Sequence, residues 1–295
     1  MRILRQWAIA LLTIMTGAMS SLAQATPVTV WNYDLLTKFA GVNTFGSGGG
    51  TQIETDTQVS WGATGGDVFT NTGNPSTNRS GITIADTDTA PGGNDPAADN
   101  ISGLVNTNAL SIPGIGLGAW ITHHNNPISG TFATLLTSQI SSTLTLFPNT
   151  PPLGGQEGPT TLTFTVYFAE TPNVSGTCAA PSPAGNPCND IFALNSVDAF
   201  NQSFVFDGET YFVSTFPLAG QGLGTFLPLS SAECAAAGAN DGCVGFTTIE
   251  GQDTTVRFGF AITSEPVTVP EPGTLALLGA GLGVAGFLSR RRRKA

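Results

Sequence analysis

The chain of 295 residues carries 20 acidic and 10 basic residues, a formal net charge of −10 at pH 7. Hydrophobic residues make up 40% of it, which is enough for a folded core and excludes disorder throughout. The basic residues gather at the two ends, so between them only Lys38, Arg79 and Arg257 stand against 19 of the 20 acids. Because nucleic-acid binding depends on Lys and Arg neutralising phosphates, this charge pattern excludes nucleic acid as a partner.

The first 25 residues have the three parts of a secretory signal peptide. Arg2 and Arg5 precede an apolar run from Trp7 to Met19, and Ala23-Gln24-Ala25 supplies the small-x-small cleavage pattern. The apolar run is too short for a comfortable membrane span. The sequence therefore predicts export by the Sec machinery and removal of residues 1–25 by signal peptidase.

Residues 26–265 are predicted to form an exported all-β domain. The clearest strand is 161–168, in which Leu162, Phe164, Val166 and Phe168 alternate with hydroxyl-bearing residues, as in a sheet with one solvated face. Other predicted strands are 27–33, 55–61, 116–124, 142–147 and 255–262, together with a hairpin over 203–213.

The hairpin is predicted to turn at Asp207-Gly208. No segment before residue 273 sustains an amphipathic helical pattern over several turns. Short strands separated by Gly, Pro, Asn and Asp turns predict a β-sandwich of jelly-roll or immunoglobulin-like type. One domain is favoured, and two alternatives are open for residues 148–159: a boundary between two domains, or a long connection between strands.

An acidic loop lies in the first half of this domain. Asp86, Asp88 and Asp95 fall in a Gly/Pro/Ala-rich stretch, and such oxygen-rich loops can bind Ca²⁺. Their spacing fits no EF-hand or nonapeptide repeat. A solvated acidic loop is therefore favoured over a Ca²⁺ site, and no cofactor is predicted.

The chain's two histidines are adjacent, in the motif Thr122-His123-His124-Asn125. The motif resembles the signature of the THxN family of PEP-CTERM proteins, and its flanking residues Trp120 and Asn126-Pro127-Ile128 look similar to that family too. The resemblance implies an exported β-domain with no assigned activity. It gives no catalytic residues, because none is established for the family.

The residues of this motif favour a structural role. Consecutive side chains of a strand point to opposite faces, so His123 and His124 should diverge and not bind one ion together. Thr122, His123 and Asn125 are expected to hydrogen-bond to backbone at a strand end. A ligand or glycan contact is the alternative. Catalysis would need a nucleophile and an acid around one histidine, and no Gly-x-Ser-x-Gly pattern singles one out.

The four cysteines fall as two local pairs, Cys178 with Cys188 and Cys234 with Cys243. In an exported protein an even number of cysteines predicts disulfides, and local pairing is favoured among the three connectivities because each bond closes a loop between adjacent strands. Each bond is expected to stabilise the fold by about 2–3 kcal/mol. A metal site is the alternative, but neither pair has C-x-x-C spacing and no histidine is near.

Residues 269–295 have three parts in a fixed order. Pro270-Glu271-Pro272 comes first, and its prolines end any preceding strand and leave Glu271 in an extended, accessible peptide. The apolar run 274–288 follows, and as a helix it would be about 22 Å long, shorter than the roughly 30 Å hydrocarbon core of a bilayer. The chain closes on the basic residues Arg290, Arg291, Arg292, Arg293 and Lys294.

The basic cluster is expected on the cytoplasmic side of the membrane by the positive-inside rule. The order of the three parts resembles the PEP-CTERM sorting signal. That resemblance implies recognition by an exosortase-type transpeptidase in the inner membrane of a Gram-negative, polysaccharide-producing bacterium, followed by release or attachment at the cell surface. A permanent C-terminal anchor is the alternative.

These features predict a non-enzymatic protein of the cell surface or extracellular matrix, associated with exopolysaccharide or biofilm. Two other functions stay open. One is a carbohydrate-binding or adhesion module, for which Trp31, Trp61 and Trp120 offer stacking rings, although these rings equally suit a core. The other is a secreted hydrolase, which would need a constellation around His123 or His124 that the sequence does not reveal.

Overall fold

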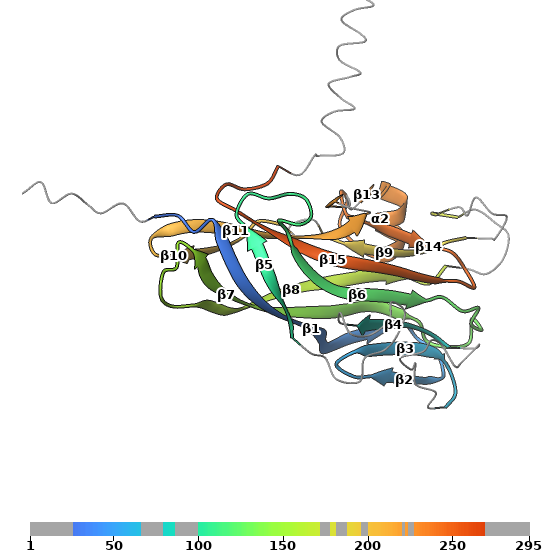
Figure 1. The fold of residues 1–295 in the computed structure, drawn as a ribbon. Helices are drawn as coiled ribbons and strands as arrows, with labels where there is room; N and C mark the ends of the chain where they lie inside the picture. The colour runs from blue at the N-terminus through green and yellow to red at the C-terminus, as the bar shows by residue number, and fades with distance from the viewer. Residues whose placement is uncertain are drawn as a thin grey trace, which may run out of the picture.

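Two curled antiparallel sheets pack as a β-sandwich (Figure 1). The computed structural model describes residues 26–65, 79–85, 100–171, 178–180, 188–195, 200–219, 222–223 and 227–268. The first sheet has the strand order β13 (Leu227–Pro228), β14 (Val244–Thr248), β9 (Asp190–Leu194), β8 (Glu157–Ala169), β7 (Leu135–Thr150), β1 (Val30–Phe45), β5 (Ile101–Asn106). The all-β prediction is confirmed.

The second sheet is built around the central strand β6. Its order is β10 (Gln202–Phe206), β11 (Glu209–Ala219), β15 (Asp253–Thr263), β6 (Gly116–His124), β4 (Ser80–Ala85), β3 (Gln58–Ala63), β2 (Thr51–Glu54), and β12 (Gly222–Leu223) pairs with β11. The structure gives β6 the same bounds that the sequence predicts.

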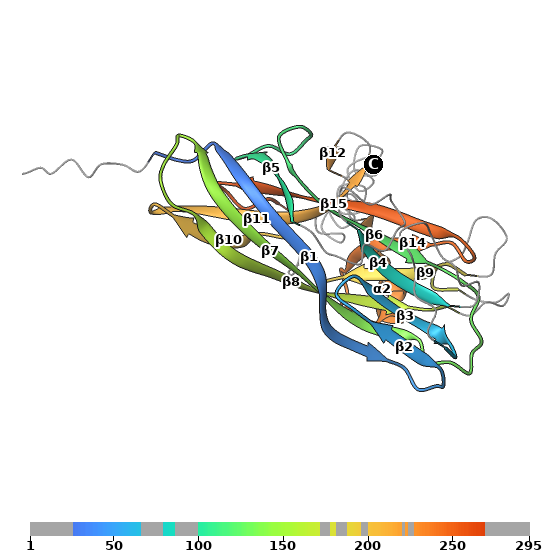
Figure 2. The same cartoon turned by 60° about the horizontal axis from the view of Figure 1, so that its bottom comes forward.

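The core lies between the two sheets and follows the alternation in the sequence. Along β1, every second side chain from Trp31 to Phe39 is buried. The predicted apolar face of β8, from Leu162 to Phe168, is buried in the same core, while Thr161 and Thr163 are exposed on the other face. Figure 2 shows β1, β7 and β8 side by side, in agreement with their pairing.

Two predicted connections are present. Asp207 and Gly208 join β10 to β11 with positive φ values of 49° and 83°, the conformation of a two-residue hairpin loop. Residues 151–156 join β7 to β8, which pair in one sheet, so this proline-rich stretch is a connection between neighbouring strands. The extent of the domain, 26–265, stays a prediction.

A short helix, α2 (Ser231–Ala237), interrupts the β structure. Ser230 and Glu233 form a capping box at its start, and Gly238 ends it with a φ of 77°. Two turns are too short for a sustained amphipathic repeat, so the sequence pattern did not predict it. The capping box was the signal that could have found it.

Both predicted disulfides are present, which confirms the local pairing. Cys178 and Cys188 have Cα atoms 5.5 Å apart and lie between the neighbouring strands β8 and β9. Cys234 in α2 and Cys243 before β14 have Cα atoms 5.8 Å apart, between the paired strands β13 and β14.

Within the described ranges, no helix combines the length and apolar character needed to cross a membrane. The predicted signal peptide, 1–25, and the predicted apolar helix, 274–288, lie outside the described residues.

Candidate functional site

The motif Thr122-His123-His124-Asn125 lies at the end of β6 and is buried. The exposed fraction of each of the four residues is 2% or less. β6 is flanked by β4 and β15, so the motif sits inside a sheet and not at its edge. As predicted, the two histidines point to opposite faces and contact different groups.

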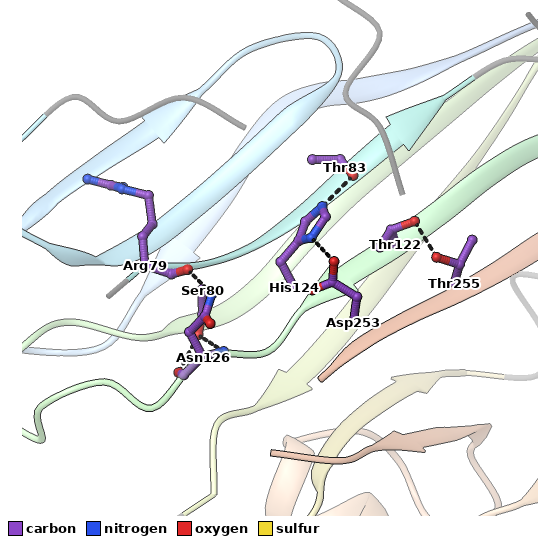
Figure 3. Close-up of polar contacts among 8 residues, drawn as sticks. All are labelled: Arg79, Ser80, Thr83, Thr122, His124, Asn126, Asp253 and Thr255. Atoms are coloured by element: carbon purple, nitrogen blue, oxygen red, sulfur yellow. Dashed lines mark hydrogen bonds and ion pairs between the residues drawn. The ribbon is translucent and has the colours of Figure 1, made fainter. Parts of the chain in front are cut away.

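His124 lies between two strands on one face of the sheet (Figure 3). Its Nε2 is 3.1 Å from Oγ1 of Thr83, and its Nδ1 is 3.0 Å from Oδ2 of Asp253, an approach that becomes an ion pair when the ring is protonated. On the same face Thr122 and Thr255 share a hydrogen bond of 2.9 Å between their hydroxyls. The motif is thereby tied to both neighbouring strands.

His123 faces the core between the two sheets. Its Nδ1 shares a hydrogen bond of 2.8 Å with Oγ1 of Thr248. The ring stacks on Trp61, with centroids 6.1 Å apart, and meets the edge of Phe168 at 4.9 Å. Burial, together with the nearby His124, lowers the pKa of His123 to about 3, so the ring is neutral at physiological pH.

The expectation of backbone hydrogen bonds from Thr122, His123 and Asn125 is wrong. The first two bond to threonine hydroxyls, and the side-chain amide of Asn125 lies against the carboxyl of Asp190. The following residue, Asn126, makes that kind of contact: its Nδ2 donates to the Arg79 carbonyl at 2.8 Å. Cross-strand hydroxyls are the partners of Thr122 and His123, because the backbone carbonyls inside a sheet are already paired.

Three carboxylates, Glu170, Asp190 and Glu250, converge beside Asn125 and form what we call the carboxylate cluster. One oxygen from each lies within 4.8 Å of the oxygens of the other two. Glu170 follows β8 and Asp190 begins β9, while Glu250 lies in the connection that passes from β14 in the first sheet to β15 in the second. The cluster therefore lies where the ends of strands from both sheets meet.

Two members of the cluster are held in place by neighbouring donors. Nε1 of Trp61 donates to Oε2 of Glu170 at 3.0 Å. Oδ1 of Asp190 accepts from the backbone N of Thr171 at 2.7 Å and from its hydroxyl at 3.1 Å. The other oxygens of these two carboxyls, Oε1 and Oδ2, are buried without a hydrogen-bond partner.

The pKa values of all three carboxyls in the carboxylate cluster are raised. Burial and the neighbouring Asp190 raise the pKa of Glu170 well above its usual range. Burial raises the pKa of Asp190 to about 7, against the lowering effect of the bonds from Thr171, and it also raises the pKa of Glu250. Among the described residues, no lysine or arginine contributes to these shifts.

The sequence did not predict the carboxylate cluster. Its members are single acids far apart in the chain, with no spacing that groups them, and only the strand pairing brings them together. The predicted acidic loop with Asp86, Asp88 and Asp95 lies outside the described residues.

The tryptophan rings divide between core and surface. Trp31 and Trp61 are fully buried and therefore serve as core residues, which leaves neither ring accessible to a glycan. Trp120 is partly exposed, and the guanidinium of Arg257 lies 5.1 Å from its ring centroid. Of the three rings considered for stacking, only Trp120 reaches the surface.

Beyond the β-sandwich, the C-terminal residues of the chain match a known family model. Residues 268–293 match the PEP-CTERM protein-sorting motif. The motif means that the protein is exported with a membrane-anchored sorting signal and is processed by an exosortase. The match does not reach residues 122–125, so the THxN resemblance stays a prediction. No curated protein matches the chain.

Proposed function

We propose that this PEP-CTERM protein is a non-enzymatic component of the extracellular polysaccharide matrix, delivered there by exosortase processing. The observation that carries the proposal is the sorting motif at residues 268–293 behind an all-β, disulfide-bonded domain. Disulfides suit an oxidising compartment outside the cytoplasm. The strongly acidic domain suits a role in solution or in a hydrated matrix, because its like charges keep it soluble.

Fractionation of the matrix tests this function. The processed protein should co-purify with the exopolysaccharide of its host and should be lost from that fraction in a strain that does not make the polymer. A Glu271→Ala protein, unable to be processed, serves as the matched control and should stay in the inner membrane. Equal amounts of protein in the culture medium with and without the polymer would contradict a matrix role.

A carbohydrate-binding or adhesion module is the first rival. Its supporting observation is Trp120, whose partly exposed ring is backed by Arg257. A glycan array with wild-type protein and Trp120→Ala tests it. Binding that disappears in the variant would favour a direct glycan contact over a purely structural role.

A secreted hydrolase is the second rival. Thr83, His124 and Asp253 lie in a line, hydroxyl to imidazole to carboxylate, with separations of 3.1 Å and 3.0 Å. A hydrolytic triad has this order, but it also needs an accessible nucleophile. Thr83 and His124 are 1% and 0% exposed, which leaves a substrate no approach, so the line is better explained as a cross-strand link. Esterase, protease and glycosidase activity that a His124→Gln variant lacks would reverse this conclusion.

A further inference from the structure

The carboxylate cluster has the arrangement of a site for a divalent cation. We propose that Glu170, Asp190 and Glu250, together with the side-chain oxygen of Asn125, bind one Ca²⁺ where the two sheets meet. This proposal concerns a different part of the molecule from the C-terminal sorting motif and does not depend on the matrix role.

The spacing of the carboxylate oxygens fits such an ion. Ca²⁺ binds oxygens at 2.3–2.6 Å, so two ligands on opposite sides of the ion stand about 5 Å apart. The three carboxylate oxygens all lie within 4.8 Å of one another. A single ion can therefore contact all three with small side-chain movements.

Unpartnered buried oxygens point to a ligand at the same place. Oε1 of Glu170 and Oδ2 of Asp190 are buried and accept no hydrogen bond. Asn125 gives the independent observation: it is 1% exposed, its side-chain amide lies close enough to Asp190 to lower the pKa of that carboxyl, and its Oδ1 has no hydrogen-bond partner. Buried polar groups without partners are costly and uncommon, and a bound cation would satisfy these oxygens.

A bound cation would also stabilise the carboxylate cluster by offsetting its negative charge. Within the described ranges, the ion pair of Lys38 with Asp56 and the approach of His124 to Asp253 involve neither Glu170 nor Asp190. Three carboxylates this close repel one another strongly when all are ionised. Protonation is the other way to relieve the repulsion, but one bound cation would contact several of these oxygens at once, including Oε1 of Glu170 and Oδ2 of Asp190, which have no hydrogen-bond partner.

The ligand chemistry selects Ca²⁺. Carboxylate and amide oxygens are hard ligands, suited to Ca²⁺ or Mg²⁺ and not to metals that prefer thiolate or imidazole. Ca²⁺ accepts irregular sets of protein oxygens, whereas Mg²⁺ demands near-octahedral geometry and keeps several waters. A site that mixes the ends of β6, β8, β9 and β14 has the irregularity that Ca²⁺ tolerates.

Calorimetric titration of the exported protein, stripped with a chelator, tests the proposal. One Ca²⁺ should bind per chain with a dissociation constant of about 10⁻³ M or tighter, the range of extracellular Ca²⁺ modules. Ca²⁺ should also raise the melting temperature, because it binds the folded state alone. Absence of saturable binding overturns the site, and Mg²⁺ binding as tightly as Ca²⁺ overturns the choice of ion.

Matched variants assign the binding to these residues. Glu250→Gln should weaken Ca²⁺ binding about tenfold or more, since even changes next to a metal ligand cost that much. Glu265→Gln, the same change at an exposed position, should bind like the wild type. Glu250 as a whole is less buried than Asp190, so this variant should keep the fold even if Asp190→Asn loses it. Equal affinity in Glu250→Gln and Glu265→Gln would overturn the assignment.

Terbium gives a second readout that depends on position. Tb³⁺ replaces Ca²⁺ at oxygen sites and luminesces when a nearby indole is excited. Trp61 donates directly to a proposed ligand, so bound Tb³⁺ should be sensitised in wild-type protein. Trp61→Phe should lose most of the luminescence, and Trp31→Phe should keep it, because Trp31 bonds Thr107 instead. Luminescence that Trp61→Phe keeps at the wild-type level would place the ion elsewhere and overturn the site.

Discussion

Trp61 and Glu170 join the two sheets of the sandwich through one hydrogen bond, 3.0 Å from the indole Nε1 to Oε2. Trp61 lies in β3 of the second sheet, and Glu170 directly follows β8 of the first. The same indole stacks on His123, so the motif and the carboxylate cluster share one buried neighbour. A residue of the hydrophobic core thereby fixes a member of a polar site.

The first prediction follows from this bond. Trp61→Phe should lower the free energy of unfolding by about 1–3 kcal/mol more than Trp31→Phe does, because it leaves a buried carboxyl oxygen without its donor. Trp31→Phe is the matched control, since Trp31 is equally buried but its Nε1 donates to the neutral hydroxyl of Thr107. Urea unfolding of both variants measures the difference. Equal losses would mean that the bond to Glu170 has no special weight.

A glycine in β14 supplies the second prediction. A Cβ on Gly245 would clash with the carbonyl oxygen of Phe192, and that oxygen belongs to the backbone of the neighbouring strand β9. Gly245→Ala should therefore be strongly destabilising, by about 3 kcal/mol or more, as expected of severe overpacking. Thermal unfolding measures it, with Gly130→Ala as the control, because a Cβ there meets nothing within 4 Å. A melting temperature unchanged by Gly245→Ala would show that β9 and β14 separate easily.

The strands β6, β8 and β9 differ in how well the sequence predicts them. β8 alternates apolar and polar residues, and β6 ends in the motif 122–125, so both strands could be predicted from the sequence. All five residues of β9 are buried: Phe192 and Leu194 join the main core, while Ile191 and Ala193 pack with Cys234 and Ala237 of α2 on the opposite face. A strand covered on both faces shows no alternation, so pattern alone could not find it.

The carboxylate cluster could not be predicted from the sequence for a different reason. Glu170, Asp190 and Glu250 each stand beside a strand end, where an acidic residue ordinarily faces solvent. Their convergence depends on the order of strands in the first sheet and on the β14–β15 connection between sheets. Strand order is set by long-range pairing, which leaves no local spacing to read in the chain.

Alkaline pH should weaken the fold through Tyr33. Its hydroxyl donates to the carbonyl of Leu117 at 3.0 Å and accepts from the N of Leu117 at 2.9 Å. Burial raises the pKa of Tyr33, so the folded state holds the neutral phenol while the unfolded chain loses its proton near pH 10. Stability from this group is therefore full below about pH 10 and falls as the pH rises above it.

Denaturant unfolding at pH 8 and at pH 11 measures the effect. Tyr33→Phe should be less stable than the wild type at pH 8, by about 1–3 kcal/mol for the lost bonds to Leu117. It should lose less stability than the wild type between the two pH values, because it has no phenol at this site to ionise. Parallel losses in the two proteins would rule out Tyr33 as the source.

The Cys234–Cys243 bond should stabilise the region around α2. The double variant Cys234→Ala/Cys243→Ala should lower the free energy of unfolding by about 2–3 kcal/mol, because the open loop regains conformational freedom in the unfolded chain. Peptide mapping without reduction should join Cys234 to Cys243 and Cys178 to Cys188 in the exported protein. Free thiols at these positions would contradict both the pairing and the expected export route.

Processing at the C-terminus is the last prediction. Residues 268–293 match the sorting motif, and Pro270-Glu271-Pro272 is the part that an exosortase is expected to read, while the apolar run only holds the chain in the membrane. A run this short and glycine-rich holds poorly as a lone anchor. The mature protein should therefore begin near Thr26 and end near residue 270, which intact mass spectrometry of released protein measures.

Two variants separate recognition from folding. Glu271→Ala, or deletion of residues 290–294, should leave an unprocessed precursor in the inner membrane. Both changes lie beyond the last strand, β15, which ends at Thr263, so the β-sandwich and its two disulfides should form as in the wild type. Glu265→Gln is the control for a nearby acid outside the motif and should be processed normally. Released protein that still carries residues 275–294 would mean that the tail is a simple anchor or an inert terminus, because exosortase cleavage removes that segment before release.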